Sequence, residues 1–169
     1  MRNLIFINSL IYLLMNVFMP YKLLLTQAIT DKLPLILGVG LITQAISTWF
    51  LGRIVDKHTK LAFIASVLLQ TGVVITFTWV ESLAFLLALE ICFILGSSTF
   101  IICEKVIIAS LTPNASLGAK FGVYDSAVAG VSGVALIISS FWLFNTQYLF
   151  LTLGLLLLIP NILIFKWIK

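Results

Sequence analysis

The sequence predicts an all-α polytopic membrane protein with six transmembrane helices, which form a single domain over residues 1–169. Of the 169 residues, 62% are hydrophobic and only 16 are charged (10 Lys+Arg and 6 Asp+Glu). A soluble domain carries about 25% charged residues, so this chain has too few charged residues to form the polar surface of a water-soluble fold. A spanning helix uses about 20 residues, so six helices use about 120 and leave room only for short connections.

Six apolar runs are long enough to cross a bilayer. Helices rather than barrel strands follow from the length of these runs, because barrel strands give an alternating pattern about ten residues long. Pro34 fits the first turn of the second helix, where a proline loses no needed hydrogen-bond donor. The predicted helices are 4–25, 34–52, 61–80, 83–103, 121–143 and 148–168.

The connections between these runs are short and polar. Residues 26–32 are polar, and residues 53–60 are the most charged stretch of the chain. Glu81-Ser82 indicates a tight hairpin, and the Pro113-Asn114 pair indicates a turn before the fifth helix. The first run follows Arg2 as a signal peptide would, but no small-x-small cleavage site comes after it, so we expect an uncleaved helix.

Basic residues are divided unevenly between the two sides of this topology. Eight lie at the termini and in the second and fourth connections, whereas Lys22 and Lys32 lie on the opposite side. The positive-inside rule therefore predicts a multi-pass protein of the cell membrane with both termini in the cytoplasm. The eight residues are Arg2, Arg53, Lys57, Lys60, Lys105, Lys120, Lys166 and Lys169.

Polar side chains recur on the first three predicted helices. An amide in hydrocarbon is costly unless it is paired, so these side chains should face the bundle interior or a wet cavity. They either form interhelical hydrogen bonds or line a cavity for a small solute. The candidate cavity residues are Asn8, Tyr12, Asn16, Gln44 and Gln70.

Three carboxylates within the apolar runs are candidates for a proton or ion site, because an ionisable group at bilayer depth is a functional hypothesis by default. Glu90 is the strongest candidate, since no basic residue of its own helix is placed to neutralise it. Glu104 is expected at the end of the fourth helix and Asp125 early in the fifth. Both are expected near the interface, where they are solvated or paired with Lys105 or Lys120.

Small residues recur every four positions on the fourth and fifth helices, which places them along one helix face and lets two backbones approach closely. The pattern predicts a helix-packing seam, which either packs statically or slides during a transport cycle. The fourth helix carries Ala84, Ala88, Cys92 and Gly96. The fifth carries the seam Gly118, Gly122, Ser126 and Gly130 at this spacing, with Gly133 one turn further on.

The second connection carries the most specific motif, with Gly52, Arg53, Asp56, Lys57 and Lys60 in the segment GRIVDKHTK. It resembles the Gly-x-x-x-Asp-Arg/Lys-x-Gly-Arg/Lys loop of the major facilitator superfamily, with Thr59 in place of the second glycine. The segment 96–133, in which a proline-containing loop leads to a glycine-rich helix, is also similar to that family. The resemblance, closest to the multidrug and small-solute efflux branch, covers one six-helix half of a twelve-helix bundle.

This resemblance implies membrane transport of a small solute, with proton-coupled efflux as one form of it. In the family the motif loop acts as a conformational latch. Alternating access needs two repeats, so the resemblance implies a second six-helix half as partner, supplied by a homodimer or a separate chain. Whether the chain corresponds to the N- or the C-terminal half stays open.

Two other readings remain. The chain is a truncated, non-functional transporter fragment, or it is the six-helix membrane substrate-binding subunit of an uptake system. An enzyme is not expected, because the sequence holds no Gly-x-Ser-x-Gly motif and no His-x-x-x-His pair. One histidine, His58, and two separated cysteines predict neither a metal site nor a cofactor. The expected partners are the lipid bilayer and a small-molecule solute, without nucleic acid.

Overall fold

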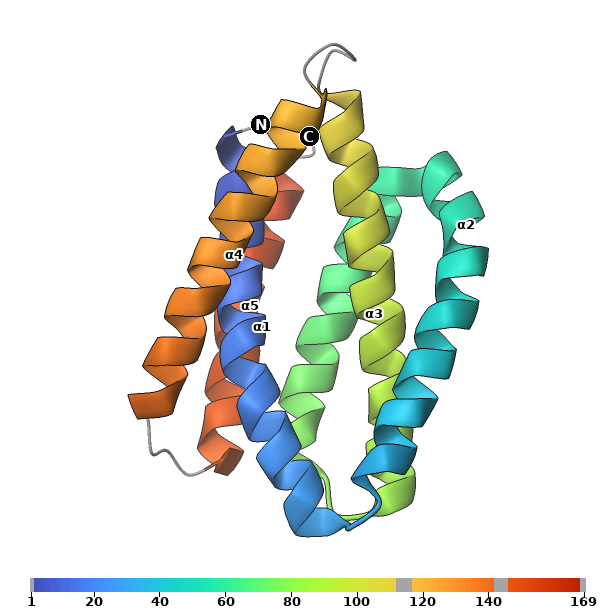
Figure 1. Cartoon of the computed structure of the whole chain (residues 1–169), viewed down its shortest axis with the longest axis vertical. Coiled ribbons are helices and arrows are strands. Elements are labelled where there is room, and N and C mark those ends of the chain that lie inside the picture. The colour runs from blue at the N-terminus through green and yellow to red at the C-terminus, as the bar shows by residue number, and fades with distance from the viewer. Residues whose placement is uncertain (1, 112–116, 142–145, 168–169) are drawn as a thin grey trace.

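The computed structural model describes residues 2–111, 117–141 and 146–167. Over these ranges the protein contains five α-helices and one short 3-10 helix, without strands, so the all-α class is confirmed. The expectation of six separate helices is wrong for the described chain. The elements are α1 (Arg2–Ile29), α2 (Leu33–Thr76), η1 (Phe77–Trp79), α3 (Leu83–Ser110), α4 (Leu117–Phe141) and α5 (Thr146–Trp167) (Figure 1).

The helix count differs because α2 runs through both the second and the third predicted helices. It begins with Pro34 in its first turn, as expected. At His58 the backbone leaves the helical region, with φ −136° and ψ 42°. Figure 1 shows α2 rising along the right-hand side, bending at the top and descending through the middle. The charged segment 53–60 therefore lies at a kink where two helical arms meet, and these arms correspond to the second and third predicted helices.

The third helix, α3, starts where the sequence predicts and ends later. Its N-cap Ser82 accepts a hydrogen bond from the backbone N–H of Phe85 at 3.3 Å, which satisfies a donor that the first helical turn leaves free. The helix continues to Ser110 instead of ending at residue 103. The charged pair Glu104-Lys105 does not end it because apolar residues follow directly. The bounds of α1, α4 and α5 differ less from the predicted 4–25, 121–143 and 148–168.

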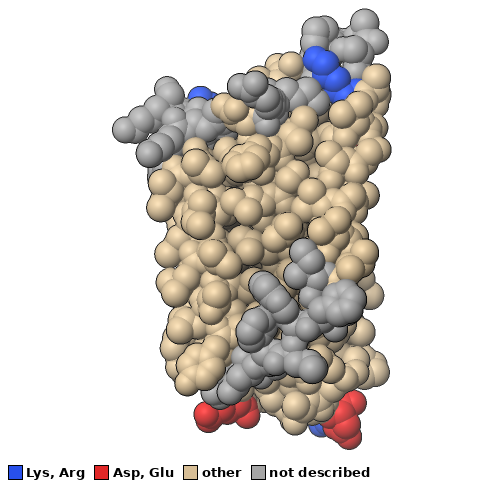
Figure 2. Space-filling model, turned by 90° about the vertical axis from the view of Figure 1, so that its left-hand side faces the viewer, with Lys and Arg blue, Asp and Glu red and all other residues tan. Residues whose placement is uncertain are grey.

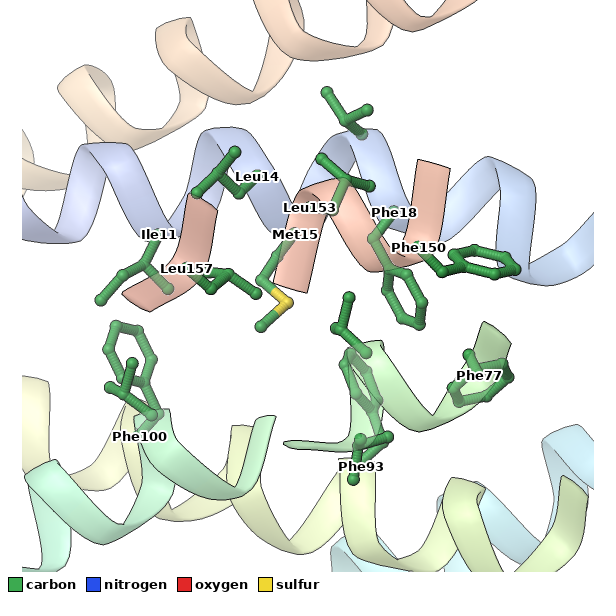
Figure 3. Close-up of a cluster of buried hydrophobic side chains, with 14 of the residues drawn as sticks. Ile11, Leu14, Met15, Phe18, Phe77, Phe93, Phe100, Phe150, Leu153 and Leu157 are labelled. Carbon is green, nitrogen blue, oxygen red and sulfur yellow. The ribbon is translucent and has the colours of Figure 1, made fainter. Parts of the chain in front are cut away.

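An aromatic cluster forms the core between α1 and the helices around it. Phe18 of α1 is fully buried, and its ring centroid lies 5.3 Å from that of Phe77, 5.4 Å from that of Phe93 and 5.5 Å from that of Phe150. These partners belong to η1, α3 and α5, so one side chain joins four elements (Figure 3). Aromatic pairs at this separation stabilise a core beyond their buried area. Elsewhere α2 packs most extensively on α3, and α1 on α4.

One face of the molecule shows no charged side chain between its two ends. In Figure 2 most of the blue Lys and Arg atoms lie at the top, the red Asp and Glu atoms lie at the bottom beside a little blue, and the tan surface between them is uncharged. Among the described residues, four helical stretches are long and apolar enough to cross a membrane, which indicates a membrane protein. They are Asn3–Ile29, Leu33–Trp79, Leu83–Ser110 and Gly118–Ile137, and the shorter apolar stretch Tyr148–Ile164 lies in α5.

Candidate functional site

A cavity of about 220 Å³ lies between α1, the second arm of α2, and α3. Three of the five predicted cavity residues, Tyr12, Asn16 and Gln70, line it, together with Ser97. The remaining lining is apolar, and Figure 3 labels its members Ile11, Met15, Phe93 and Phe100. No Lys, Arg, Asp or Glu of the described chain is among the lining residues. The cavity thus offers a few polar atoms in an apolar, uncharged surrounding.

Gln70 is the polar group of the cavity with an unused hydrogen-bond donor. Its side chain is 2% exposed, and its Nε2 has no hydrogen-bond partner. Such an unpaired buried amide costs free energy unless something binds it. The side chain fits there because position 96 is glycine: a Cβ at Gly96 would lie 3.0 Å from the Cγ of Gln70 and 3.3 Å from the carbonyl oxygen of Ser66.

A polar network joins α1 to α3 and α4 on one side of this cavity. The Asn8 amide donates to Glu104 Oε1 at 3.2 Å and to the Tyr124 hydroxyl at 2.6 Å, and the Tyr12 hydroxyl donates to Glu104 Oε2 at 2.9 Å. Glu104 is therefore 3% exposed and held by two neutral donors, rather than solvated or paired with Lys105 at a helix end as expected. The amide of Asn16 extends the α1–α4 contact to the Ser132 hydroxyl at 2.9 Å.

Glu90 forms a buried ion pair with Lys22, although no base of its own helix is near it. The two side chains are 4% and 6% exposed. The ammonium of Lys22 also lies 4.8 Å from the centroid of the Phe93 ring, which lines the cavity. A Cβ at Gly40 would lie 3.2 Å from Glu90 Oε1, so this glycine gives the carboxylate its space against α2. The distribution of basic residues predicts Lys22 on the outer side of the membrane and gives no sign of its partner.

The predicted latch residues lie on the α2 bend. Arg53, Asp56, Lys57 and Lys60 are exposed, and Gly52 is half-buried. The Arg53 guanidinium lies 5.4 Å from the centroid of the Trp49 ring, on the outer arm of α2. Positive charge at this bend is thus presented outward at the end of the molecule.

The small-residue ladder of α4 packs on none of the described helices. A methyl group added at Gly118, Gly122, Gly130 or Gly133 would meet no described atom within 4 Å, and Ser126 is exposed. On α3, Ala84 and Ala88 are exposed as well, whereas Gly96 contacts α2. Among the described glycines the tightest contact is at Gly154 of α5, where a Cβ would overlap Ile75 of α2.

Two further predicted site residues do not line the cavity. Gln44 is exposed on the first arm of α2, and Asp125 is exposed on α4. A second polar contact between helices, absent from the sequence analysis, joins the amide of Asn161 in α5 to the Thr71 hydroxyl at 3.0 Å. Over the described ranges, no three His, Cys, Asp or Glu side chains are grouped to hold a metal ion.

Comparison with known proteins identifies no relative: neither a protein-family model, nor a curated protein, nor a solved structure matches the chain.

Proposed function

We propose that the protein is a facilitator-like half transporter that moves a small solute across the cell membrane together with a second six-helix half. The observation that carries the proposal is the cavity containing Gln70, whose amide N–H groups have no partner in a water-poor interior. A solute that accepts a hydrogen bond would satisfy this donor, and apolar rings nearby would contact the rest of it. The cavity volume of about 220 Å³ equals that of about seven waters at roughly 30 Å³ each, which favours a small solute.

The uncharged lining favours a neutral solute. Lys22 and Glu90 lie beside the cavity at Phe93 and pair with each other, so neither is available to neutralise a charged ligand without breaking the pair. The solute class that fits is a small neutral molecule with a carbonyl or hydroxyl acceptor and an apolar or aromatic part.

The outward-facing ladder of α4 supports a partner half. In lipid there is no hydrophobic effect to drive helices together. Helices associate there through close packing, which small residues allow because they let two backbones approach. Because Gly122 and Gly130 meet no described helix, a second chain is the natural occupant of this face. We assign the ladder to the contact with the second half, whether that half is another copy or a separate chain.

The proposed orientation has both termini in the cytoplasm, with the α2 bend on the same side. The bend, which carries Asp56, Lys57 and Lys60, would then serve as the latch against the other half. Arg53 and Lys105 lie towards that same end, whereas Asp31 and Glu81 lie in the connections at the opposite end.

If transport is proton-coupled, Glu104 is better suited than Glu90 to carry the proton. Glu90 is tied to a cation, whereas the described partners of Glu104 are the neutral donors Asn8 and Tyr12. The variant Glu104→Gln should abolish dependence of the flux on a proton gradient while leaving solute binding. Flux that still follows the gradient in this variant would exclude Glu104 as the carrier.

The transport proposal is tested by comparing cells that express the chain with cells that do not. We expect at least one small neutral metabolite, measured by mass spectrometry, to change its ratio between cells and medium. The variant Gln70→Trp, which fills the cavity, should remove that change, and the matched variant Gln44→Trp should keep it. The proposal fails if the chain changes no metabolite ratio, or if both variants behave alike.

The partner proposal is tested separately by crosslinking in membranes. The variants Gly122→Ile and Gly130→Ile should abolish association while the helical content stays unchanged, because their side chains enter open space. A monomer that is active in reconstituted vesicles would contradict the requirement for a second half.

A membrane substrate-binding subunit is the second candidate, and one observation favours it: the cavity is lined by helices of one chain. Such a subunit needs no latch, so Asp56→Asn should leave its activity intact, whereas the half transporter should lose activity.

A further inference from the structure

A second pocket, of about 700 Å³, lies at the basic end of the molecule between the α2 bend and the last turns of α3. Figure 1 shows the bend and the end of α3 at the same end of the molecule. The pocket is separate from the solute cavity, because the two share no lining residue.

The lining of this pocket combines two chemistries. Lys57, His58 and Lys60 come from the bend, and all three are exposed. Neither lysine forms an ion pair with a described carboxylate, so both ammonium groups are available to an external anion. Leu61, Val106 and Ile107 give the same pocket an apolar wall.

A cationic edge beside an apolar wall is complementary to an amphiphile with an anionic head. The ends of membrane-spanning helices lie at the depth of lipid headgroups, and basic pockets there attract anionic lipids. An inorganic anion would use only the lysines and leave the wall unoccupied. A zwitterionic lipid would present a cation of its own to the two ammonium groups.

We propose that this pocket binds one anionic phospholipid. The phosphate lies at Lys57 and Lys60 near the bend, with His58 beside it, and the first part of an acyl chain lies on Leu61, Val106 and Ile107. The bound lipid would join the bend of α2 to the end of α3. The proposal does not depend on transport, since it concerns a different pocket and a different ligand.

The experiment is a lipid titration of the full chain in mild detergent, followed by native mass spectrometry. The probes are phosphatidylglycerol, phosphatidylcholine with the same acyl chains, and inorganic phosphate. We expect one phosphatidylglycerol per chain, bound at least roughly tenfold more tightly than either other probe. Equal binding of phosphatidylcholine, or of phosphate alone, would overturn the proposal.

Variants distinguish a defined site from general attraction to positive charge. The double variant Lys57→Gln/Lys60→Gln should weaken phosphatidylglycerol binding by about twenty-fivefold, since each lysine contributes roughly fivefold. The control Lys105→Gln/Lys120→Gln removes the same amount of charge near the same end of the molecule, but neither residue lines the pocket. It should weaken phosphatidylglycerol binding by less than about threefold. An equal loss of phosphatidylglycerol binding in both double variants would overturn the proposal, because it would show only a general attraction of the anionic lipid to positive charge.

A third variant tests the apolar wall. Ile107→Trp leaves every charge in place and reduces the space for the acyl chain, so it should also weaken phosphatidylglycerol binding by roughly tenfold. Unchanged binding in this variant would overturn the assignment of the wall. Circular dichroism of each variant checks that the helical content is kept.

Discussion

Lys22 of α1 and Glu90 of α3 form an ion pair in the interior of the bundle, with side chains 6% and 4% exposed. Breaking a buried pair by removing one partner leaves an uncompensated charge, which is far more costly than removing both. This pair therefore links α1 to α3 beside the cavity that Gln70 lines.

The pair predicts a strongly non-additive mutant cycle. Lys22→Met should lower the free energy of unfolding by about 3–5 kcal/mol because Glu90 then remains charged without a partner. The double variant Lys22→Met/Glu90→Leu should recover most of that loss. Unfolding in mild detergent, followed by circular dichroism, measures the cycle, and additive single effects would show that the charges do not interact.

The unpaired amide of Gln70 predicts a variant that is more stable and less active. Gln70→Leu removes a buried donor without a partner, so the free energy of unfolding should stay the same or rise by about 1–2 kcal/mol. Gln44→Leu, on the exposed arm of α2, should change it little. A large loss of stability in Gln70→Leu would mean that the amide is paired within the protein.

Glycines at two positions should respond differently to the same change. Gly154→Ala places a methyl group into Ile75 and should destabilise the fold by about 1–3 kcal/mol through overpacking. Gly72→Ala meets nothing within 4 Å and should be neutral or stabilising by up to about 1 kcal/mol. In the Gly154→Ala background, Ile75→Ala should restore stability. Thermal unfolding compares the four proteins.

The distribution of charge predicts which ends of the helices are accessible from outside the cell. In a background without Cys92 and Cys103, a cysteine at Glu81 should react with an impermeant thiol reagent in intact cells, whereas one at Lys57 should not. Permeabilised cells serve as the control for reactivity at Lys57. Labelling of Lys57→Cys in intact cells would reverse the topology and exclude the proposed cytoplasmic latch.

Much of this arrangement could be predicted from local sequence. Apolar runs and the distribution of charges predict long helices with two charged ends, since both depend on composition along the chain. The spacing of Tyr12 and Asn16 by four residues places them on one helix face, and both line the cavity. Ser82 and Pro34 mark helix starts for reasons that are local to each helix.

Pairing between distant segments could not be predicted in this way. Lys22 and Glu90 lie on different helices, and no local pattern tells which basic residue reaches a buried acid. The adjacent charges of Glu104 and Lys105 predict the end of a helix. In the structure Glu104 is buried instead, because Asn8 and Tyr12 of α1 donate hydrogen bonds to it. The period of the α4 ladder identifies a common face but not the direction in which that face points.

The kink of α2 at His58 has a mechanical consequence. The backbone leaves the helical region at this residue, so the two arms of α2 are two helices joined end to end. A helix passes a rotation along its axis only as far as its hydrogen bonds are unbroken. A rotation of the arm that carries Gln70 would therefore change the angle between the arms at His58 and leave Trp49 and Phe50, exposed on the far arm, in place.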